Sequence, residues 1–227
     1  MTSDDDDRHR RLVAAANPRR ANSADAAQLA RLFTAALLND PVFDWIARRG
    51  PRRAAGLERF FFWLLQMRAI PYGEVWMSAD GGVATAWLPP DVPASPGGFW
   101  EQMRLVPMFW RLCGIPRLTR GSAMSEAMDR NHPHERHYYL SFIGVAPRLQ
   151  GLGLGSALLD ATLARIDETG VPAYLENSNP KNTRLYERYG FVRRKNISPP
   201  GAPPLIAMWR GARPRALVFQ GSSSLSQ

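Results

Sequence analysis

Apolar residues recur every three or four positions along several stretches of the chain, the spacing of helices with one buried face. Ser23 or Asp25 can cap the first of these stretches, which runs to about Leu38. A break at Asp40–Pro41 comes before a short helix. The predicted helices are residues 23–38, 41–49, 52–68, 153–169 and 180–190, with further helical stripes over 91–135.

Shorter runs of β-branched and aromatic residues between these stretches predict strands. Asp80–Gly81–Gly82 is a tight-turn sequence, so residues 73–90 are expected to form a hairpin. The other predicted strands are 11–16, 136–145, 172–177, 191–194 and 205–210.

This mixture of strands and helices predicts an α/β (α+β) fold. We expect a single domain over residues 11–210, with a helical insertion at about 91–135. Residues 1–10 are expected to be disordered and residues 211–227 to form a flexible tail.

Composition limits the classes of protein that fit. A chain of 227 residues with 45% hydrophobic residues can bury the core of one α/β domain. It has no run of about 18 apolar residues and its start lacks the order of a secretory signal. Cys113 is the single cysteine, which excludes an internal disulfide. These features favour a cytoplasmic protein that does not enter a membrane.

The chain is basic, with 29 Lys and Arg against 20 Asp and Glu and a net charge of +9. Lys181 and Lys195 are the only lysines, so nearly all the positive charge is arginine. The arginines are scattered rather than gathered in one block, which argues against a nucleic-acid partner. The charge suits a polyanionic cofactor instead.

Gly151, Gly153 and Gly155 alternate with other residues between a predicted strand and a predicted helix. Glycine lets a ligand approach the backbone closely, and the start of a helix presents unpaired N–H groups and a positive dipole end. The combination predicts a phosphate site. The spacing differs from the G-x-G-x-x-G of a dinucleotide-binding unit, and no lysine follows the glycines as in a Walker loop.

The pattern Gln150-x-x-Gly153-x-Gly155 after a strand resembles the acetyl-CoA signature of the GNAT superfamily of N-acetyltransferases. Residues 179–191, NPKNTRLYERYGF, resemble the segment of that family in which an asparagine precedes a Tyr-Glu pair and a Gly-Phe. Over about residues 11–210 the chain looks most like the puromycin N-acetyltransferases and their actinobacterial relatives. The resemblance implies a GNAT fold, a mixed, twisted sheet whose two central strands splay apart around acetyl-CoA.

The resemblance also implies roles around the acyl donor. Asn182 is expected to hydrogen-bond the pantetheine arm, and the phenol of Tyr186 to protonate the departing thiolate. Splaying after Ile143 would leave strand N–H groups free for the acetyl oxygen and the pantetheine amides. The expected cofactor-binding set is Ile143, Val145, Gln150, Gly151, Gly153, Gly155, Ser156 and Asn182.

A base for the acceptor amine is harder to assign. Some superfamily members carry Glu or His on the central strand, at positions where this chain has Tyr139 and Ser141. Strand alternation predicts that both face the same side as Ile143 and Val145, where they could order water. Glu176, which closes the next strand, is the nearest carboxylate. It is either the catalytic base or a surface or ion-paired residue.

The acceptor site is predicted from residues 91–135, whose tryptophans and methionines are either packed core or the wall of a pocket. His132, His134 and His137 have a spacing that a metal could use but lack a fourth ligand, so no metal is predicted. The predicted substrate-binding residues are Asp40, Trp45, Trp100, Trp110, Tyr139 and Ser141.

The sequence therefore predicts an acetyl-CoA-dependent N-acetyltransferase, a monomer or homodimer, that acts on a small primary amine such as an antibiotic or an aromatic metabolite. Two alternatives stay open, a protein or peptide N-acetyltransferase and a CoA-binding module without catalysis. A closed aromatic pocket would favour the small amine, and an open acidic groove a protein. Tyr186 and Asn182 argue against the module.

Overall fold

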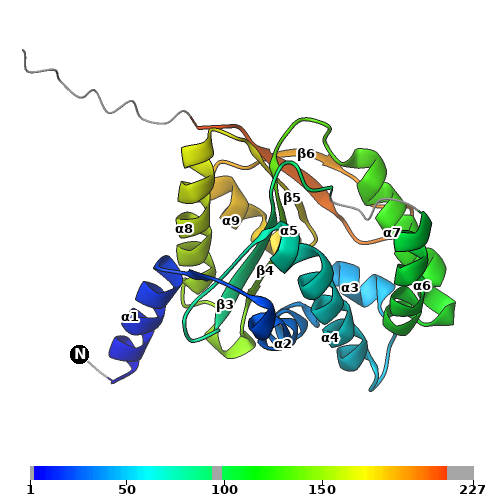
Figure 1. Ribbon diagram of the computed structural model, residues 1–227, viewed down its shortest axis with the longest axis horizontal. Helices are drawn as coiled ribbons and strands as arrows, with labels where there is room; N and C mark the ends of the chain where they lie inside the picture. Colours follow the sequence, from blue (N-terminus) through cyan, green and yellow to red (C-terminus); the bar gives the residue numbers. More distant parts are fainter. Residues whose placement is uncertain (1–2, 94–98, 214–227) are drawn as a thin grey trace, which may run out of the picture.

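The computed structural model describes residues 3–93 and 99–213, with the backbone alone over residues 99–105. Within these residues seven strands form one sheet in the order β1-β2-β3-β4-β5-β7-β6 (Figure 1). β4 and β5 run parallel, and the other neighbouring strands run antiparallel. The strands are β1 (Arg19–Arg20), β2 (Glu74–Met77), β3 (Val83–Leu88), β4 (Tyr138–Val145), β5 (Ala173–Asn177), β6 (Val192–Asn196) and β7 (Ile206–Arg210).

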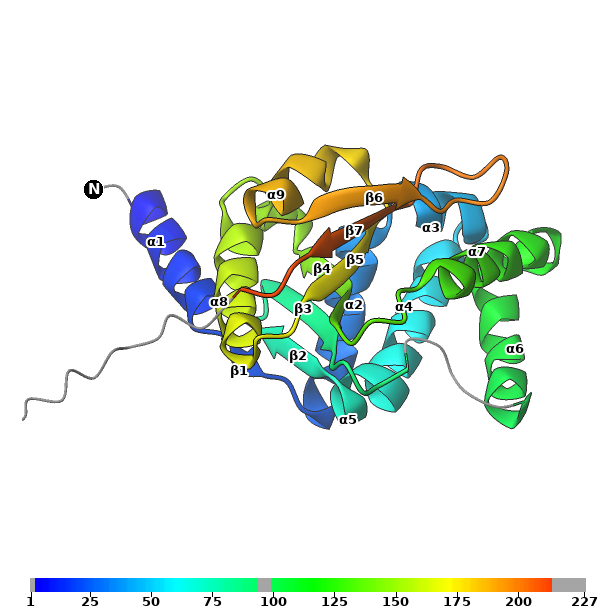
Figure 2. The same ribbon diagram turned by 90° about the horizontal axis from the view of Figure 1, so that it is seen from above.

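Helices cover both faces of this sheet, which confirms the predicted fold class. One face carries α2 (Ala26–Leu37), α3 (Pro41–Ile46) and α4 (Arg53–Leu64), and the other carries α8 (Leu154–Thr169) and α9 (Thr183–Arg188). The helices α6 (Phe99–Cys113) and α7 (Leu118–Asn131) stand at the end of the molecule opposite α8 (Figures 1 and 2). The remaining helical pieces are Ser23–Asp25, the π-helix Leu65–Ala69, α5 (Ile70–Tyr72), Ile115–Arg117, Pro147–Leu149 and Pro180–Asn182.

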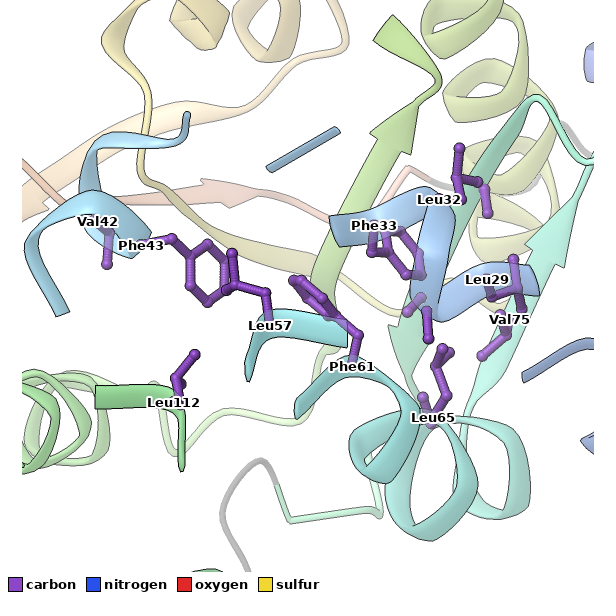
Figure 3. Close-up of a cluster of buried hydrophobic side chains, with 14 of the residues drawn as sticks. Leu29, Leu32, Phe33, Val42, Phe43, Leu57, Phe61, Leu65, Val75 and Leu112 are labelled. Atoms are coloured by element: carbon purple, nitrogen blue, oxygen red, sulfur yellow. The ribbon is translucent and has the colours of Figure 1, made fainter. Parts of the chain in front are cut away.

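The larger core lies between α2, α3, α4 and the sheet (Figure 3). Aromatic rings dominate it: the ring centroids of Phe43 and Phe61 are 5.4 Å apart, and those of Phe33 and Phe61 are 5.7 Å apart. The apolar stripe predicted over residues 52–68 faces this core, because Leu57, Phe61 and Leu65 are all fully buried. The core therefore forms a rigid support on one side of the central strands.

The start of the chain differs from the sequence prediction. Residues 3–10, expected to be disordered, and residues 11–16, expected to be a strand, form the helix α1 (Ser3–Ala16). Leu12 and Ala15 pack against the first turns of α8, and the carboxylates of Asp4–Asp6 lie in the first turn, where they counter the helix dipole. Alanine favours helix over strand, so local propensity and packing against α8 both support the helix.

Two further expectations can be compared with the described residues. No helix in the ranges 3–93 and 99–213 is long and apolar enough to span a bilayer. The tail expected over residues 211–227 falls almost entirely outside the described residues.

Candidate active site

β4 and β5 pair at their first residues and then part. Residues 138–140 of β4 lie opposite residues 173–175 of β5, and the register ends there. The sequence predicted that the strands would separate after Ile143, whereas the structure places the separation after Leu140. On the other edge of β4, Phe142 lies opposite Ala86 and Leu140 opposite Trp87, so Ser141 is the extra residue of a β-bulge.

The bulge changes which side chains of β4 share a face. Tyr139 packs on the α2–α4 side, whereas Ile143 and Val145 face α8: a Cβ added to Gly155 would lie 3.2 Å from Val145 Cγ2 and 4.0 Å from Ile143 Cδ1. The prediction that Tyr139 shares the face of Ile143 and Val145 is therefore wrong, because the inserted Ser141 shifts the strand's alternation by one residue.

A cavity of about 280 Å³ opens where the two strands part. Its wall comes from β4, β5 and α9 on the sheet side and from α3, α4, α6 and α7 on the other. The predicted site residues that line it are Asp40, Tyr139, Ser141, Ile143, Glu176, Asn182 and Tyr186. The fold thus brings together residues from four separate segments of the sequence.

Glu176 is buried in the wall of this cavity, with 2% of its side chain exposed. The hydroxyl of Tyr139 donates to its Oε2 at 2.9 Å, and the hydroxyl of Tyr174 donates to its Oε1 at 3.1 Å. Burial beside this carboxylate raises the pKa of both phenols, so both remain donors at neutral pH. The surface position that sequence analysis left open for Glu176 is thereby excluded.

Tyr186 and Asn182 lie on the opposite side of the parting strands, on α9 and just before it. Tyr186 is 6% exposed, and burial, with a smaller contribution from Asp40, raises the pKa of its phenol. The phenol therefore carries its proton at neutral pH. Asn182 precedes the first residue of α9 and makes no side-chain capping hydrogen bond there, so its amide can face the cavity.

Asp40 is a buried helix cap rather than a carboxylate at the pocket mouth. Its Oδ1 accepts from the N–H groups of Val42 and Phe43 at 2.9 and 3.2 Å, and its Oδ2 accepts from the Ser178 hydroxyl at 2.5 Å. Burial raises its pKa, although these hydrogen bonds oppose the effect. Asp40 thus fastens α3 to the end of β5 while presenting a carboxyl group to the cavity wall.

The glycine loop leads into α8 with an open N-terminus. Gly151 and Gly153 adopt positive φ values of 81° and 91°, a conformation that glycine adopts at little cost. Gly153 precedes the first residue of α8 and provides no side-chain cap, while the Gln150 side chain donates to the Val145 carbonyl at 3.2 Å and ties the loop to β4. A Cβ added to Gly151 would have no atom within 4 Å, so the loop leaves room for an anion before the helix start.

The predicted tryptophans do not meet at the cavity. Trp45 lies on α3 under the guanidinium of Arg120, 5.4 Å from its ring centroid, and does not line the cavity. Trp110 is 48% exposed and borders a separate surface hollow among arginines. Trp100 belongs to the part of α6 whose side chains lie outside the described residues.

The apolar wall comes partly from the segment predicted to form the acceptor site, residues 91–135, and partly from α3 and α4. Helices α6 and α7 contribute to it, so this segment is both packed core and cavity wall. The helical stripes had predicted buried faces without showing that those faces leave a space between them. The predicted segment contributes Met108, Phe109, Met124 and Met128, and the residues that sequence analysis did not assign are Phe43, Phe60 and Trp63.

Asp129, His132 and Arg68 also line the cavity without having been assigned to it. Arg68 donates to the carbonyl of Pro93. The described residues contain no group of three or more His, Cys, Asp or Glu able to hold a metal. The histidine-rich segment was weighed only as a metal site, so its link to the cavity was missed.

Part of this chain is similar in sequence to a protein family and to several known proteins. Residues 121–191 match the profile of the Acetyltransferase (GNAT) family. Mycothiol acetyltransferase of Paenarthrobacter aurescens is 37% identical over 76 residues, covering 32% of this chain and 24% of the relative. A GCN5-like protein acetyltransferase of Mycobacterium tuberculosis is 31% identical over 103 residues, covering 44% of each. The chain thus spans less than half the length of these relatives.

Solved structures match over nearly the whole fold. The structure titled histone acetyltransferase HPA2 and related acetyltransferase, from Corynebacterium glutamicum, has a TM-score of 0.67 at 24% identity and covers 88% of this chain and 98% of its own. A Drosophila melanogaster polyamine N-acetyltransferase has a TM-score of 0.53 at 18% identity, with 86% and 98% covered. These structures share the fold of this chain, and residues 121–191 match the profile of the acetyltransferase family.

Proposed function

We propose that this protein is an acetyl-CoA-dependent N-acetyltransferase for a small primary amine with an apolar or aromatic body. The observation that carries the proposal is the cavity at the parting of β4 and β5. It brings a phenol, a buried carboxylate and an amide together from distant parts of the chain.

The acyl donor is assigned to the α8 side of the parting strands. The N–H groups from Gly151 to Ser156 are proposed to hold the pyrophosphate, and Gln150 fixes the loop through Val145. Ile143 and Val145 are proposed to offer main-chain groups on the strand edge that β5 no longer covers. Asn182, free of a capping contact, is proposed to bind the pantetheine arm.

The chemistry needs a group that takes protons and a group that gives one. A new C–N bond forms as the C–S bond of the thioester breaks, the ammonium nitrogen loses two protons, and the thiolate gains one. Tyr186 is proposed to give its phenolic proton to the sulfur and to regain a proton as the nitrogen loses its second one. Glu176 is proposed to accept the first proton, which converts the ammonium into the attacking amine. Tyr139 and Tyr174 hold both carboxylate oxygens and so fix the orientation of Glu176.

The acceptor class follows from the composition of the cavity wall. Asp40, Asp129 and Glu176 attract a cationic amine, and the aromatic and methionine side chains suit a flat or hydrophobic body. A cavity of about 280 Å³ fits a small molecule better than a protein surface. The proposed setting is a cytoplasmic monomer or homodimer without a nucleic-acid partner.

The test measures release of free thiol from acetyl-CoA with a panel of amines. The panel holds aromatic amines, among them puromycin because of the sequence likeness, together with aliphatic polyamines and lysine peptides. We expect transfer to at least one aromatic or apolar amine, with mass spectrometry showing an N-acetyl product. Faster transfer to lysine peptides would support the protein-acetyltransferase alternative, and CoA binding without transfer to any amine would support the non-catalytic module.

A further inference from the structure

A histidine-rich segment, residues 132–137, precedes β4, and its first histidine approaches the carboxylate of Glu176. His132 follows α7, and its Nδ1 lies 4.0 Å from Oε1 of Glu176. On its other side, Nε2 of His132 lies 3.2 Å from Nε2 of His137. The two imidazoles therefore form a chain that begins at the cavity wall.

Hydrogen bonding determines which ring nitrogens of His132 and His137 carry a hydrogen. Nδ1 of His137 lies 2.6 Å from the carbonyl oxygen of Glu135, which can only accept, so Nδ1 carries the hydrogen. Burial lowers the pKa of His137, and in the neutral ring Nε2 is then an acceptor. His132 must donate to it from Nε2. A neutral His132 therefore has its unprotonated Nδ1 directed to Glu176.

The surroundings give His132 the access to water that Glu176 lacks. The side chain of His132 is 22% exposed, against 2% for Glu176. Tyr139 and Tyr174 hold the His132 ring edge-on, with centroids 5.0 and 5.2 Å away. The 4.0 Å gap to Glu176 is one that a small side-chain rotation or a bridging water closes.

We propose that His132 is the proton outlet of the reaction, taking from Glu176 the proton that the acceptor ammonium has given to it and releasing that proton to solvent. The inference rests on the proposed function. Each turnover releases one net proton, since the nitrogen loses two and the thiolate takes one. In the relay the O–H bond of Glu176 breaks, a bond from hydrogen to His132 Nδ1 forms, and solvent then takes the proton. His132 acts through Glu176 and is a positioning residue.

The relay predicts how the rate depends on pH. His132 accepts a proton only when its Nδ1 is unprotonated, so replacing His132 should change how kcat depends on pH. The titratable and charged groups near the two imidazoles of His132 and His137 are Glu176 and Tyr174 of β5, Tyr139 of β4, Asp129 of α7, and Glu135 in the loop before β4.

The test compares His132→Gln and His132→Phe with His134→Gln, an exposed histidine two positions away. Acetyl transfer is followed at saturating substrates over about pH 6 to pH 9, with and without added imidazole. We expect kcat of the His132 variants to fall about tenfold or more, with both KM values nearly unchanged and imidazole restoring part of the rate. His134→Gln should match the wild type. His132→Phe keeps the ring contacts, so melting curves separate loss of the relay from unfolding.

Several results would overturn the relay. A folded His132→Phe enzyme with wild-type kcat and pH profile would do so, as would a loss confined to KM or not relieved by imidazole. If the wild type acetylates no amine, the proposed function fails and the relay fails with it. If the wild type transfers the acetyl group and the His132 variants are unaffected, the relay is refuted and the proposed function stands.

Discussion

Asp40 links the fold to the cavity, and asparagine and alanine at this position separate its two contributions. Asp40→Asn keeps an oxygen that can accept from the N–H groups of Val42 and Phe43 and removes the charge. Asp40→Ala removes both the cap and the contact to Ser178. Loss of a helix cap costs about 1 kcal/mol, and a buried hydrogen bond to a charged group contributes roughly 1.5–3 kcal/mol. We therefore expect the free energy of unfolding to fall by about 3 kcal/mol in Asp40→Ala and by about 1 kcal/mol in Asp40→Asn.

The cost of Asp40→Asn should also depend on pH. Burial raises the pKa of Asp40 above its ordinary value of 3.8, so the folded state binds this proton more tightly than the unfolded state. Its contribution to stability is therefore greatest below pH 3.8 and is lost as the pH rises through the folded-state pKa. Asparagine does not titrate, so its disadvantage should shrink between about pH 4 and pH 8.

Urea unfolding of the three proteins at the two pH values measures these differences, and acceptor KM shows whether the charge draws in a cationic amine. Asp44→Asn is the matched control, because the Asp44 side chain is 57% exposed and pairs with Arg53 at 2.8 Å. Such an exposed pair is worth at most about 1 kcal/mol. The reasoning is refuted if Asp40→Asn costs as much as Asp40→Ala at pH 8, or if its disadvantage grows with pH.

Two further substitutions test the donor side. Tyr186→Phe should lower kcat by about 10²–10⁴-fold with little change in the KM for acetyl-CoA. Tyr138→Phe, at the start of β4 and outside the cavity, should leave kcat unchanged. A change confined to KM would mean that the Tyr186 hydroxyl binds rather than protonates. Gly153→Ala should lower the free energy of unfolding by about 1–2 kcal/mol, because alanine is strained at a φ of +91°. The added Cβ itself meets no close neighbour, since the nearest atom is Leu12 Cδ2 at 3.5 Å. The substitution should also weaken CoA binding. Gly170→Ala imposes a similar strain at φ +66° with open space around it and should leave CoA binding intact, so equal CoA affinity in the two variants would contradict the loop assignment.

The sequence predicted the strand, glycine-loop and helix order from 136 to 169, because the glycines and the apolar spacing are local signals. It also placed a helix break at Asp40–Pro41, which α3 confirms. The strand predicted at residues 11–16 was wrong: alanine favours helix, the acidic residues before the run suit a helix start, and contact with α8 stabilises the helix. The alternation along β4 failed at Ser141, since a bulge depends on pairing with β3 and has no local signature here.

The sequence by itself determined the chemical groups available and the elements that carry them: a glycine-rich helix start, a tyrosine and an asparagine near one short helix, and a carboxylate at the end of a strand. Only the tertiary structure decided which groups meet. Tyr139 reaches the buried Glu176 from the adjacent strand β4, and Tyr174 reaches it from its own strand β5. Trp110 faces solvent although its helix helps to form the cavity. Helical or strand spacing fixes which side of an element is apolar, but distances between segments depend on how the elements pack, and packing is a property of the whole chain.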